Sequence, residues 1–219
     1  MVSKLNKKLY ADAENSITNL EEEKALEIAE IAKKEGIELS ELIEKGYAKG
    51  LKQVGQQFEE GLLFLPELSR AGEIMEKVMA ILEPVIEKQG GELSKKGIVV
   101  IGTVKDDLHN IGKNLVKALL TAYGYDVYDL GMDTPAEEFL KKAREVKADV
   151  IGASCLLTST KAELKNIVDY LEEKESRNDY LFVIGGAATS LEFANEIGAD
   201  GYGENAQKAV KLIDKLLER

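Results

Sequence analysis

The stretch that decides the fold is IVVIGTVKDDLHNIG, residues 98–112. Residues 98–102 form a short apolar run rich in β-branched side chains, which is typical of a buried strand. A polar segment follows, and a helical pattern begins after it. A strand that leads through a loop into a helix is the first half of a βαβ unit, so this stretch predicts a parallel sheet.

The same alternation continues to the end of the chain. Four further apolar runs are expected to be strands: Asp126–Leu130, Val150–Ala153, Leu181–Ile184 and Ala199–Tyr202. Three capping-box patterns stand where helices should follow strands: Thr134–Glu137, Thr160–Glu163 and Thr189–Glu192. Together these elements predict an α/β domain with a flavodoxin-like (Rossmann-like) five-stranded parallel sheet of order 2-1-3-4-5. Such a sheet binds its ligand beyond the carboxyl ends of the first and third strands.

The first ninety residues have a different period. Apolar residues recur there at three- and four-residue spacing, which predicts a bundle of four helices. The expected helix boundaries are a capping box at Thr18–Glu21, a stop at Gly36, a cap at Ser40, a stop at Gly61 and a start at Pro66. Glycines inside the third helix predict close approach of a neighbouring backbone: Gly46, Gly50 and Gly55.

The two patterns imply two domains joined by a short polar segment. We expect a helical bundle cap over residues 1–90, a linker over residues 91–97 and a sheet domain over residues 98–219. The glycines of the segment Gly90–Gly97 make it the expected hinge between the domains.

Composition excludes several classes of protein. The chain has 219 residues and a formal net charge of −11, which disfavours binding to nucleic acid or to an anionic membrane surface. One cysteine excludes an internal disulfide and a cysteine-built zinc site, and one histidine excludes a multi-histidine metal site. The start of the sequence has no signal-like apolar run, and no run is long enough to span a bilayer, so a cytoplasmic location is expected.

The single histidine, His109, stands in the loop after the first predicted strand, where this architecture binds ligands. An imidazole can bind a metal through one nitrogen while the other donates to a carboxylate, and Asp107 is the expected carboxylate. The alternative is an ordinary loop histidine beside a helix-capping aspartate.

The spacing Asp107-x-His109-x-x-Gly112 resembles the motif of the cobalamin-binding domain family. Two companions match that family at neighbouring strand ends, Ser154-Cys-Leu156 and Gly185-Gly186. The resemblance implies bound cobalamin in the base-off/His-on state, in which His109 replaces the cofactor's own benzimidazole on cobalt. It implies these cofactor-binding residues in the sheet domain: Asp107, His109, Ile111, Gly112, Ser154, Leu156, Thr158, Gly185 and Gly186.

A third polar residue joins Asp107 and His109 in methyl-transferring members of that family. The matching position here is Thr160, which would complete a catalytic set for proton relay. Thr160 also begins a capping box, so capping is the competing interpretation. Two residues depart from the family pattern, because many relatives have Gly at position 106 and Asp at position 110, where this chain has Asp106 and Asn110. Cys155 is expected to be a small buried residue without a redox role.

The helical half selects among the members of the family. The segment from Phe58 to Leu68 resembles the helical cap of methionine synthase and of small corrinoid proteins that serve methylamine, methanol and aromatic O-demethylating systems. The resemblance implies that Phe58 and Leu65 cover the upper face of the corrin. The alternative is that both side chains belong to the core of the bundle.

These matches imply a methyl carrier that is not catalytic alone but forms the corrinoid subunit of a methyltransferase system. The implied partners are a substrate-specific methyltransferase, an acceptor methyltransferase that uses a thiol or a tetrahydrofolate-type pteridine, and a reductive activase. Competing interpretations are the small subunit of an adenosylcobalamin mutase, a cobalamin store or sensor, and a flavodoxin-like protein without cobalamin. The mutase subunit should lack a helical cap, and a sensor should carry an output domain.

Overall fold

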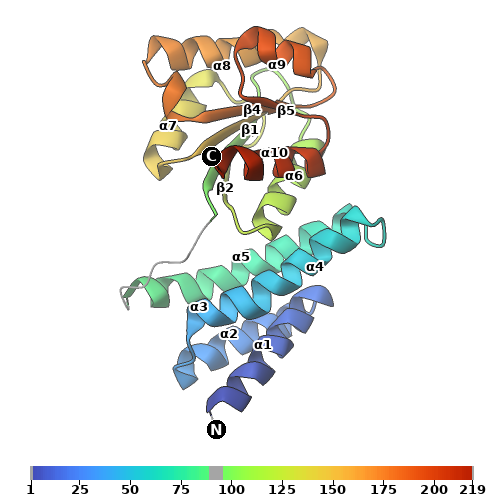
Figure 1. The fold of residues 1–219 in the computed structure, drawn as a ribbon, viewed down its shortest axis with the longest axis vertical. Helices are drawn as coiled ribbons and strands as arrows, with labels where there is room; N and C mark the ends of the chain where they lie inside the picture. The colour runs from blue at the N-terminus through green and yellow to red at the C-terminus, as the bar shows by residue number, and fades with distance from the viewer. Residues whose placement is uncertain (1, 89–95, 219) are drawn as a thin grey trace. The chain divides into compact units, whose positions relative to one another are not determined.

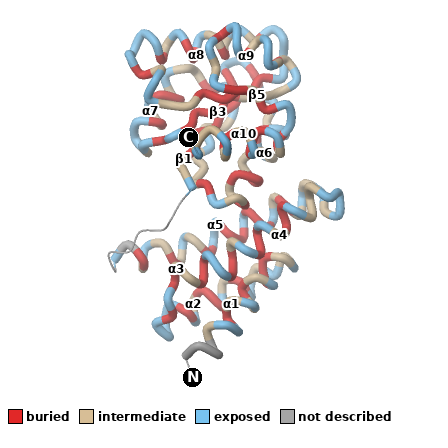
Figure 2. Tube along the Cα trace, in the orientation of Figure 1, coloured by how far each residue is buried: buried red, intermediate tan, exposed pale blue. Residues whose placement is uncertain are grey.

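The computed structural model describes residues 2–88 and 96–218, which divide into a helical unit and a sheet unit (Figure 1). Most of the predicted linker lies outside the described residues. Within each unit, buried residues line the inner faces of the helices and make up most of the strands (Figure 2). No helix in the described ranges is both long and apolar enough to cross a membrane.

The helical unit contains α1 (Val2–Thr18), α2 (Glu22–Glu35), α3 (Leu39–Leu42), a π-helical turn (Ile43–Tyr47), α4 (Ala48–Glu59) and α5 (Leu65–Lys88). The third predicted helix is therefore one continuous rod made of α3, the π-helical turn and α4. The predicted stop at Gly36 is confirmed, because this residue has a φ of 65° and its N–H bonds to the carbonyl of Ala32.

Two predicted helix caps in this unit are wrong. The Thr18 hydroxyl donates to the carbonyl of Glu14, one turn back, so α1 runs through Thr18 and α2 begins four residues later. Ser40 lies inside α3, whose N-cap position is Glu38, and no side chain caps that helix. Serine and threonine occur inside helices as well as at helix starts. The sequence pattern alone therefore predicted the wrong position for both caps.

The sheet unit contains β1 (Ile98–Thr103), β2 (Asp126–Asp129), β3 (Val150–Ser154), β4 (Leu181–Gly185) and β5 (Gly201–Gly203). All pairings are parallel and the order is β2-β1-β3-β4-β5, as predicted. The helices between the strands are α6 (Ile111–Ala122), α7 (Ala136–Val146), α8 (Ala162–Glu173), α9 (Leu191–Ile197) and α10 (Ala206–Leu217), with short 3-10 turns at Thr158–Thr160 and Arg177–Asp179.

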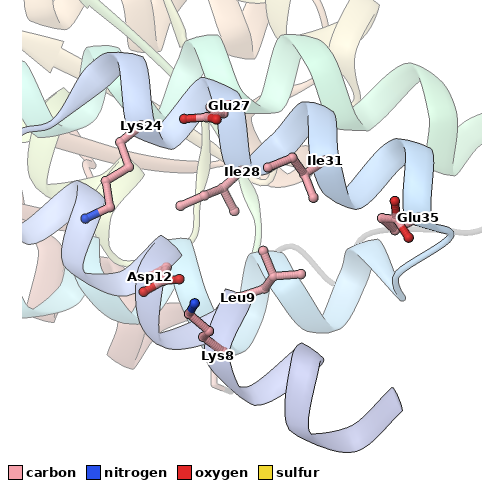
Figure 3. Close-up of a pocket in the computed structure, with 8 residues that line it drawn as sticks. All are labelled: Lys8, Leu9, Asp12, Lys24, Glu27, Ile28, Ile31 and Glu35. Carbon is pink, nitrogen blue, oxygen red and sulfur yellow. The ribbon is translucent and has the colours of Figure 1, made fainter. Parts of the chain in front are cut away.

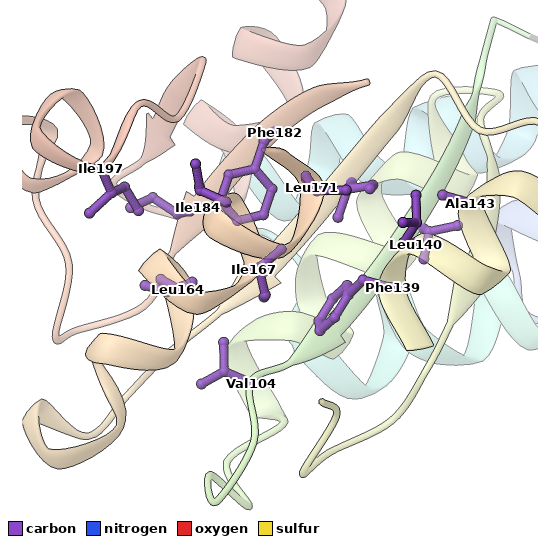
Figure 4. Packing of buried hydrophobic residues seen from close by; sticks show 14 of the residues in the cluster. Val104, Phe139, Leu140, Ala143, Leu164, Ile167, Leu171, Phe182, Ile184 and Ile197 are labelled. Atoms are coloured by element: carbon purple, nitrogen blue, oxygen red, sulfur yellow. The ribbon is translucent and has the colours of Figure 1, made fainter. Parts of the chain in front are cut away.

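Helices cover both faces of this sheet. Figure 1 shows α7, α8 and α9 on one face and α6 and α10 on the other. On the first face, Phe139 and Leu171 pack with the β4 residues Phe182 and Ile184 in a closed apolar cluster (Figure 4). The side chains of the alternate residues of each strand lie on the second face, because successive side chains point to opposite faces of a sheet.

The capping boxes predicted in the sheet unit are wrong at two positions and displaced at the third. The N-cap positions of α7 and α8 are Pro135 and Lys161, without a side-chain cap, so Thr134 and Thr160 do not cap these helices. At α9 the cap is Ser190, whose hydroxyl accepts from the N–H of Phe193 at 3.2 Å. Thr189 instead donates to the carbonyl of Gly186 at 2.6 Å.

Candidate functional site

His109 lies in the loop between β1 and α6, at the carboxyl edge of the sheet. The last residue of β1, Thr103, donates through its hydroxyl to the carbonyl oxygen of His109 at 2.9 Å. Asp107 accepts from the backbone N–H of His109 at 3.0 Å. The backbone of His109 is therefore bonded to the sheet through its carbonyl and to its own loop through its N–H.

The imidazole of His109 is held at one nitrogen only. Its Nδ1 lies 2.8 Å from Oδ1 of Asp107, whose side chain is fully buried, whereas the His109 side chain is 51% exposed. No hydrogen bond to Nε2 occurs among the described residues. A carboxylate that accepts from Nδ1–H leaves the lone pair of Nε2 available, which is the state that a metal-binding histidine requires.

The other carboxylate oxygen of Asp107 joins this loop to the end of β3. Oδ2 accepts from the N–H groups of Leu156 at 2.7 Å and Leu157 at 3.2 Å, and lies 3.4 Å from the Thr160 hydroxyl. Burial raises the pKa of Asp107, but these N–H donors and those of His109 outweigh it and lower the pKa to about 2. Asp107 is therefore a carboxylate at neutral pH.

The hydroxyl of Thr160 has three neighbours. It lies 3.1 Å from the carbonyl oxygen of Leu157, 3.3 Å from Sγ of Cys155 and 3.4 Å from Oδ2 of Asp107. A hydroxyl has one proton, so it donates to one of these acceptors at a time. The sequence left open whether Thr160 caps a helix or joins a proton relay. It does not cap α8, whereas the contact with Asp107 is present. Cys155 is fully buried, as predicted.

Large apolar side chains are exposed on the loops around His109 and at the first residue of α6. They are Leu108, Ile111, Met132, Leu156 and Leu157. The loops around His109 follow β1, β2 and β3. Asp107, in the first of them, accepts through its side chain from the N–H of Leu156 in the third loop. Its backbone carbonyl accepts from the N–H of Asp133 in the second loop. Exposed apolar residues in one place are typical of a binding surface for a large apolar ligand.

A cavity of about 320 Å³ opens between the sheet and the helices α6 and α10. Five predicted residues line it: Gly112, Ser154, Leu156, Gly185 and Gly186. Its apolar walls come from both helices and from the strands, with Val99, Val116 and Ile213 as examples. The structure therefore brings these five residues together around one hollow at the carboxyl edge of the sheet.

The remaining predicted residues lie elsewhere. Ile111 and Thr158 are exposed and do not line the cavity. Phe58, near the end of α4, and Leu65, the first residue of α5, belong to the helical unit, and both side chains are partly exposed. Gly186 has a φ of 106°, and a Cβ there would lie 2.2 Å from the carbonyl oxygen of Cys155, so the fold itself requires glycine at this position.

A buried lysine on the cavity wall, paired with a partly exposed aspartate, was not predicted from the sequence. Lys113 is 2% exposed, and its Nζ lies 2.5 and 2.6 Å from the two carboxylate oxygens of Asp129 and 2.9 Å from Oδ1 of Asn114. The detectable signal was a lysine at helical spacing with Val116 and Leu120, on the apolar face of α6.

The described residues contain no group of three or more histidine, cysteine or acidic side chains that could hold a metal ion. A lone imidazole with a free Nε2 fits a metal whose other ligands come from a macrocycle. The exposed apolar loops and the adjoining cavity fit a large ligand with a flat ring and a tail.

A second hollow, of about 420 Å³, lies between α1 and α2 in the helical unit. Figure 3 shows Leu9, Ile28 and Ile31 pointing into it, with charged side chains of both signs around them. It contains none of the predicted site residues.

Comparisons with known proteins show the family to which the chain belongs. Residues 97–211 match the family described as "B12 binding domain", and residues 9–83 match a second family with the same description. A corrinoid protein of Desulfitobacterium hafniense is 44% identical over 95% of this chain and 97% of its own length. Trimethylamine corrinoid protein 1 of Methanosarcina acetivorans is 42% identical over 95% of this chain and 97% of its own length.

Solved structures agree with the sequence relatives. A chain of the methanol:cobalamin methyltransferase complex MtaBC of Methanosarcina barkeri has a TM-score of 0.87 and 32% identity, covering 96% of this chain and 80% of that one. A cobalamin-binding protein of Desulfitobacterium hafniense has a TM-score of 0.67 and 30% identity, covering 93% and 96%. The chain therefore belongs to the family of corrinoid proteins that combine a helical and an α/β B12-binding domain.

Proposed function

We propose that this chain is a methyl carrier that binds cobalamin base-off, with Nε2 of His109 as the lower axial ligand of cobalt. The observation that carries the proposal is the Asp107–His109 pair, which leaves Nε2 as the unbonded nitrogen of an exposed imidazole. Cobalt supplies the atom on which the methyl group is carried, and the chemistry of that bond belongs to the cofactor.

The chain's own residues set the state of the imidazole. Asp107 accepts from Nδ1–H, which selects the tautomer that presents Nε2 to the metal and strengthens Nε2 as a ligand. Asp107 would also stabilise the imidazolium if Nε2 of His109 took up a proton. The Thr160 hydroxyl lies 3.4 Å from Oδ2 of Asp107, and we assign Thr160 to the exchange of that proton.

The cavity beside the loop is suited to the displaced nucleotide tail. Ser154 and Gly185 line it at the carboxyl edge of the sheet, next to the loops that present the exposed apolar residues. We assign the tail to this cavity, and the lower face of the corrin to the surface of Leu108, Ile111 and Leu156, with Gly112 and Thr158 beside it.

The helical unit supplies the second half of the carrier. We assign Phe58 and Leu65 to the upper face of the corrin, where they shield the methyl group. We place the helical cap at residues 1–90, the linker at residues 91–97, the cobalamin-binding domain at residues 98–219 and the hinge at the segment Gly90–Gly97. Opening at the hinge then gives partner enzymes access to the upper face.

The proposed partners follow from the chemistry of a carrier. Relatives of this chain are described as trimethylamine and dimethylamine corrinoid proteins, and one similar structure belongs to a methanol:cobalamin methyltransferase complex. We propose a donor-specific methyltransferase, an acceptor methyltransferase that uses a thiol or a pteridine, and a reductive activase, all in the cytoplasm.

The test is a transfer assay with the full chain loaded with hydroxocobalamin, desalted and reduced. With a donor-specific methyltransferase and radiolabelled trimethylamine, dimethylamine or methanol, we expect label on the loaded chain in proportion to bound corrinoid. Addition of an acceptor methyltransferase should move the label to a thiol. A loaded chain that takes label from none of these donors contradicts the carrier role, and a chain that loses all corrinoid on desalting contradicts the proposal as a whole.

A further inference from the structure

The face of the sheet that lines the cavity carries few large side chains. Paired residues on this face form two rows across the strands: Ile101, Gly152, Val183 and Gly201, and Thr103, Ser154, Gly185 and Gly203. Four of these eight positions are glycines. A Cβ at Gly152 would lie 3.4 Å from Cγ1 of Ile101, an ordinary contact, so the fold does not forbid a side chain there. The space above Gly152 is a hollow that a small residue keeps open.

The buried part of this cavity is apolar. Val99, Leu120, Val183 and Ile213 line it and are almost fully buried. The backbone N–H and C=O groups of β1, β3 and β4 are engaged in the sheet, because each of these strands pairs on both sides. A polar atom of a ligand placed at this end would therefore find no hydrogen-bond partner on the strands.

The charged group of Lys113, on the cavity wall, is fully hydrogen-bonded to other residues of the protein. Lys113 directs its ammonium to both carboxylate oxygens of Asp129 and to Oδ1 of Asn114, which matches its capacity of three donors. Asp129 in turn accepts from the N–H of Gly131 at 2.9 Å. Lys113 therefore presents its alkyl chain to the cavity.

The hydroxyl of Ser154 differs from the other polar groups of the wall. It lines the cavity at the end of β3 and makes no hydrogen bond to any residue that the structure describes. Glu204 and Asn205, which also line the cavity, are exposed and interact with Lys208 at the start of α10. The cavity thus offers one hydroxyl without a hydrogen-bond partner among the described residues, an apolar end and a polar rim.

We propose that this cavity selects among corrinoids by the base of the nucleotide tail. The inference rests on the proposed function and adds the ligand class. A benzimidazole base has a single free ring nitrogen, which can accept from Ser154, and an otherwise apolar ring that fills the end lined by Val99 and Val183. A purine base such as adenine carries an amino group and further ring nitrogens, which would lie unpaired against those valines. Burying a polar group unpaired is costly, so the chain discriminates against purine tails.

The test measures dissociation constants of the full-length chain for three corrinoids by spectroscopic titration. The probes are cobalamin, the analogous cobamide with an adenine base, and cobinamide, which lacks the nucleotide tail. We expect cobalamin to bind at least about tenfold more tightly than the adenine form, equivalent to about 1.4 kcal/mol. Equal affinity for these two overturns the selection while the proposed function stands. Equal affinity for cobalamin and cobinamide also overturns it, and failure to bind any of the three contradicts the proposed function.

Two variants locate the selection in the cavity. Val183→Thr adds a hydroxyl to the apolar end at nearly constant volume, and we expect it to reduce the preference for cobalamin over the adenine form by about threefold or more. Val100→Thr is the matched control, because Val100 is equally buried but belongs to the apolar cluster on the opposite face. An equal change of the ratio in both variants overturns the assignment.

Gly152→Ala provides a test that does not depend on a buried hydroxyl. Its Cβ fills part of the hollow, so affinity for both tailed corrinoids should fall by about fivefold or more while affinity for cobinamide stays constant. Unchanged affinity for the tailed forms, or an equal loss for cobinamide, overturns the placement of the tail in this cavity.

Discussion

Asp107 determines what His109 can do, because a fully buried carboxylate is held by donors from two loops. The motif predicted the pair, since both residues stand within one short loop. The role of Thr160 was ambiguous in the sequence, because a threonine three residues before a glutamate has the same pattern whether it caps a helix or contacts a distant carboxylate. The contact joins residues 53 positions apart, and only the fold brings them together.

The low pKa of Asp107 predicts how stability depends on pH. A folded-state pKa of about 2, below the ordinary value of 3.8, stabilises the fold above about pH 4, and this contribution is lost as the pH falls toward 2. Asp107→Asn should therefore lower the free energy of unfolding by about 2 kcal/mol at pH 7. Urea unfolding of both proteins between pH 7 and pH 3 checks this. A difference that grows as the pH falls would contradict the assignment.

Asp106 has a left-handed backbone conformation at a position where the family resemblance leads us to expect glycine. Its φ is 63°, a left-handed conformation that glycine adopts freely and other residues adopt at a cost. The chain retains the conformation because the N–H of Asp106 donates to Oδ1 of Asp133 at 2.7 Å.

Asp106→Gly should keep that backbone bond and raise the free energy of unfolding by about 0.5–1 kcal/mol, since it removes the left-handed strain. The control is Lys105→Gly at the preceding residue, which does not have a positive φ and should lose about 0.5–1 kcal/mol. Thermal unfolding of the two variants without cofactor provides the measurement. Destabilisation by both substitutions would show that no strain is stored at position 106.

At the scale of elements, the spacing of apolar residues predicted the helices and strands well, because burial of one face determines this spacing in both kinds of element. Helix starts were predicted poorly. The hydroxyls of Thr18 and Thr160 bond to carbonyl oxygens of nearby residues, and Ser190 rather than Thr189 caps α9. These choices depend on which acceptors the folded chain places nearby, and local sequence does not contain that information.

The close backbone approach predicted in the third helix is confirmed at two glycines. A Cβ at Gly46 would lie 2.9 Å from Cβ of Ala13, and one at Gly50 would lie 2.5 Å from the carbonyl oxygen of Glu14. Side chains at these positions would push α1 away from α4 and the π-helical turn.

Gly50→Ala should therefore destabilise the protein by about 2 kcal/mol or more, because the obstructing atom is backbone and cannot rotate away. Gly72→Ala on α5 is the matched control. A Cβ there meets nothing within 4 Å, so the higher helix propensity of alanine should stabilise the protein by up to about 1 kcal/mol. Chemical denaturation distinguishes the two, and equal effects would contradict the packing described here.

At the scale of the whole molecule, the sheet order and the position of the histidine loop were predictable because parallel βαβ topology allows few alternatives. The cavity was not, because it depends on which residues of β1, β3, β4 and β5 lie side by side, with Gly152 between Ile101 and Val183 and Gly185 beside Gly203, and register is a property of the folded sheet. The family resemblance named Ile111 and Leu156 as cofactor-binding residues, but it did not name Leu108, and the exposure of all three side chains was not predicted because leucine and isoleucine are ordinarily core residues.

The central claim is that the one histidine of this chain binds cobalt, and the measurement that tests it most directly is electron paramagnetic resonance of the cobalt(II) form. The full chain is produced with ¹⁵N-labelled histidine and loaded with unlabelled cobalamin. Base-off/His-on binding predicts that the nitrogen splitting changes from the triplet of ¹⁴N to the doublet of ¹⁵N, and that His109→Ala shows no doublet. A triplet in the labelled protein would mean that cobalamin's own benzimidazole remains on cobalt, and would contradict the account.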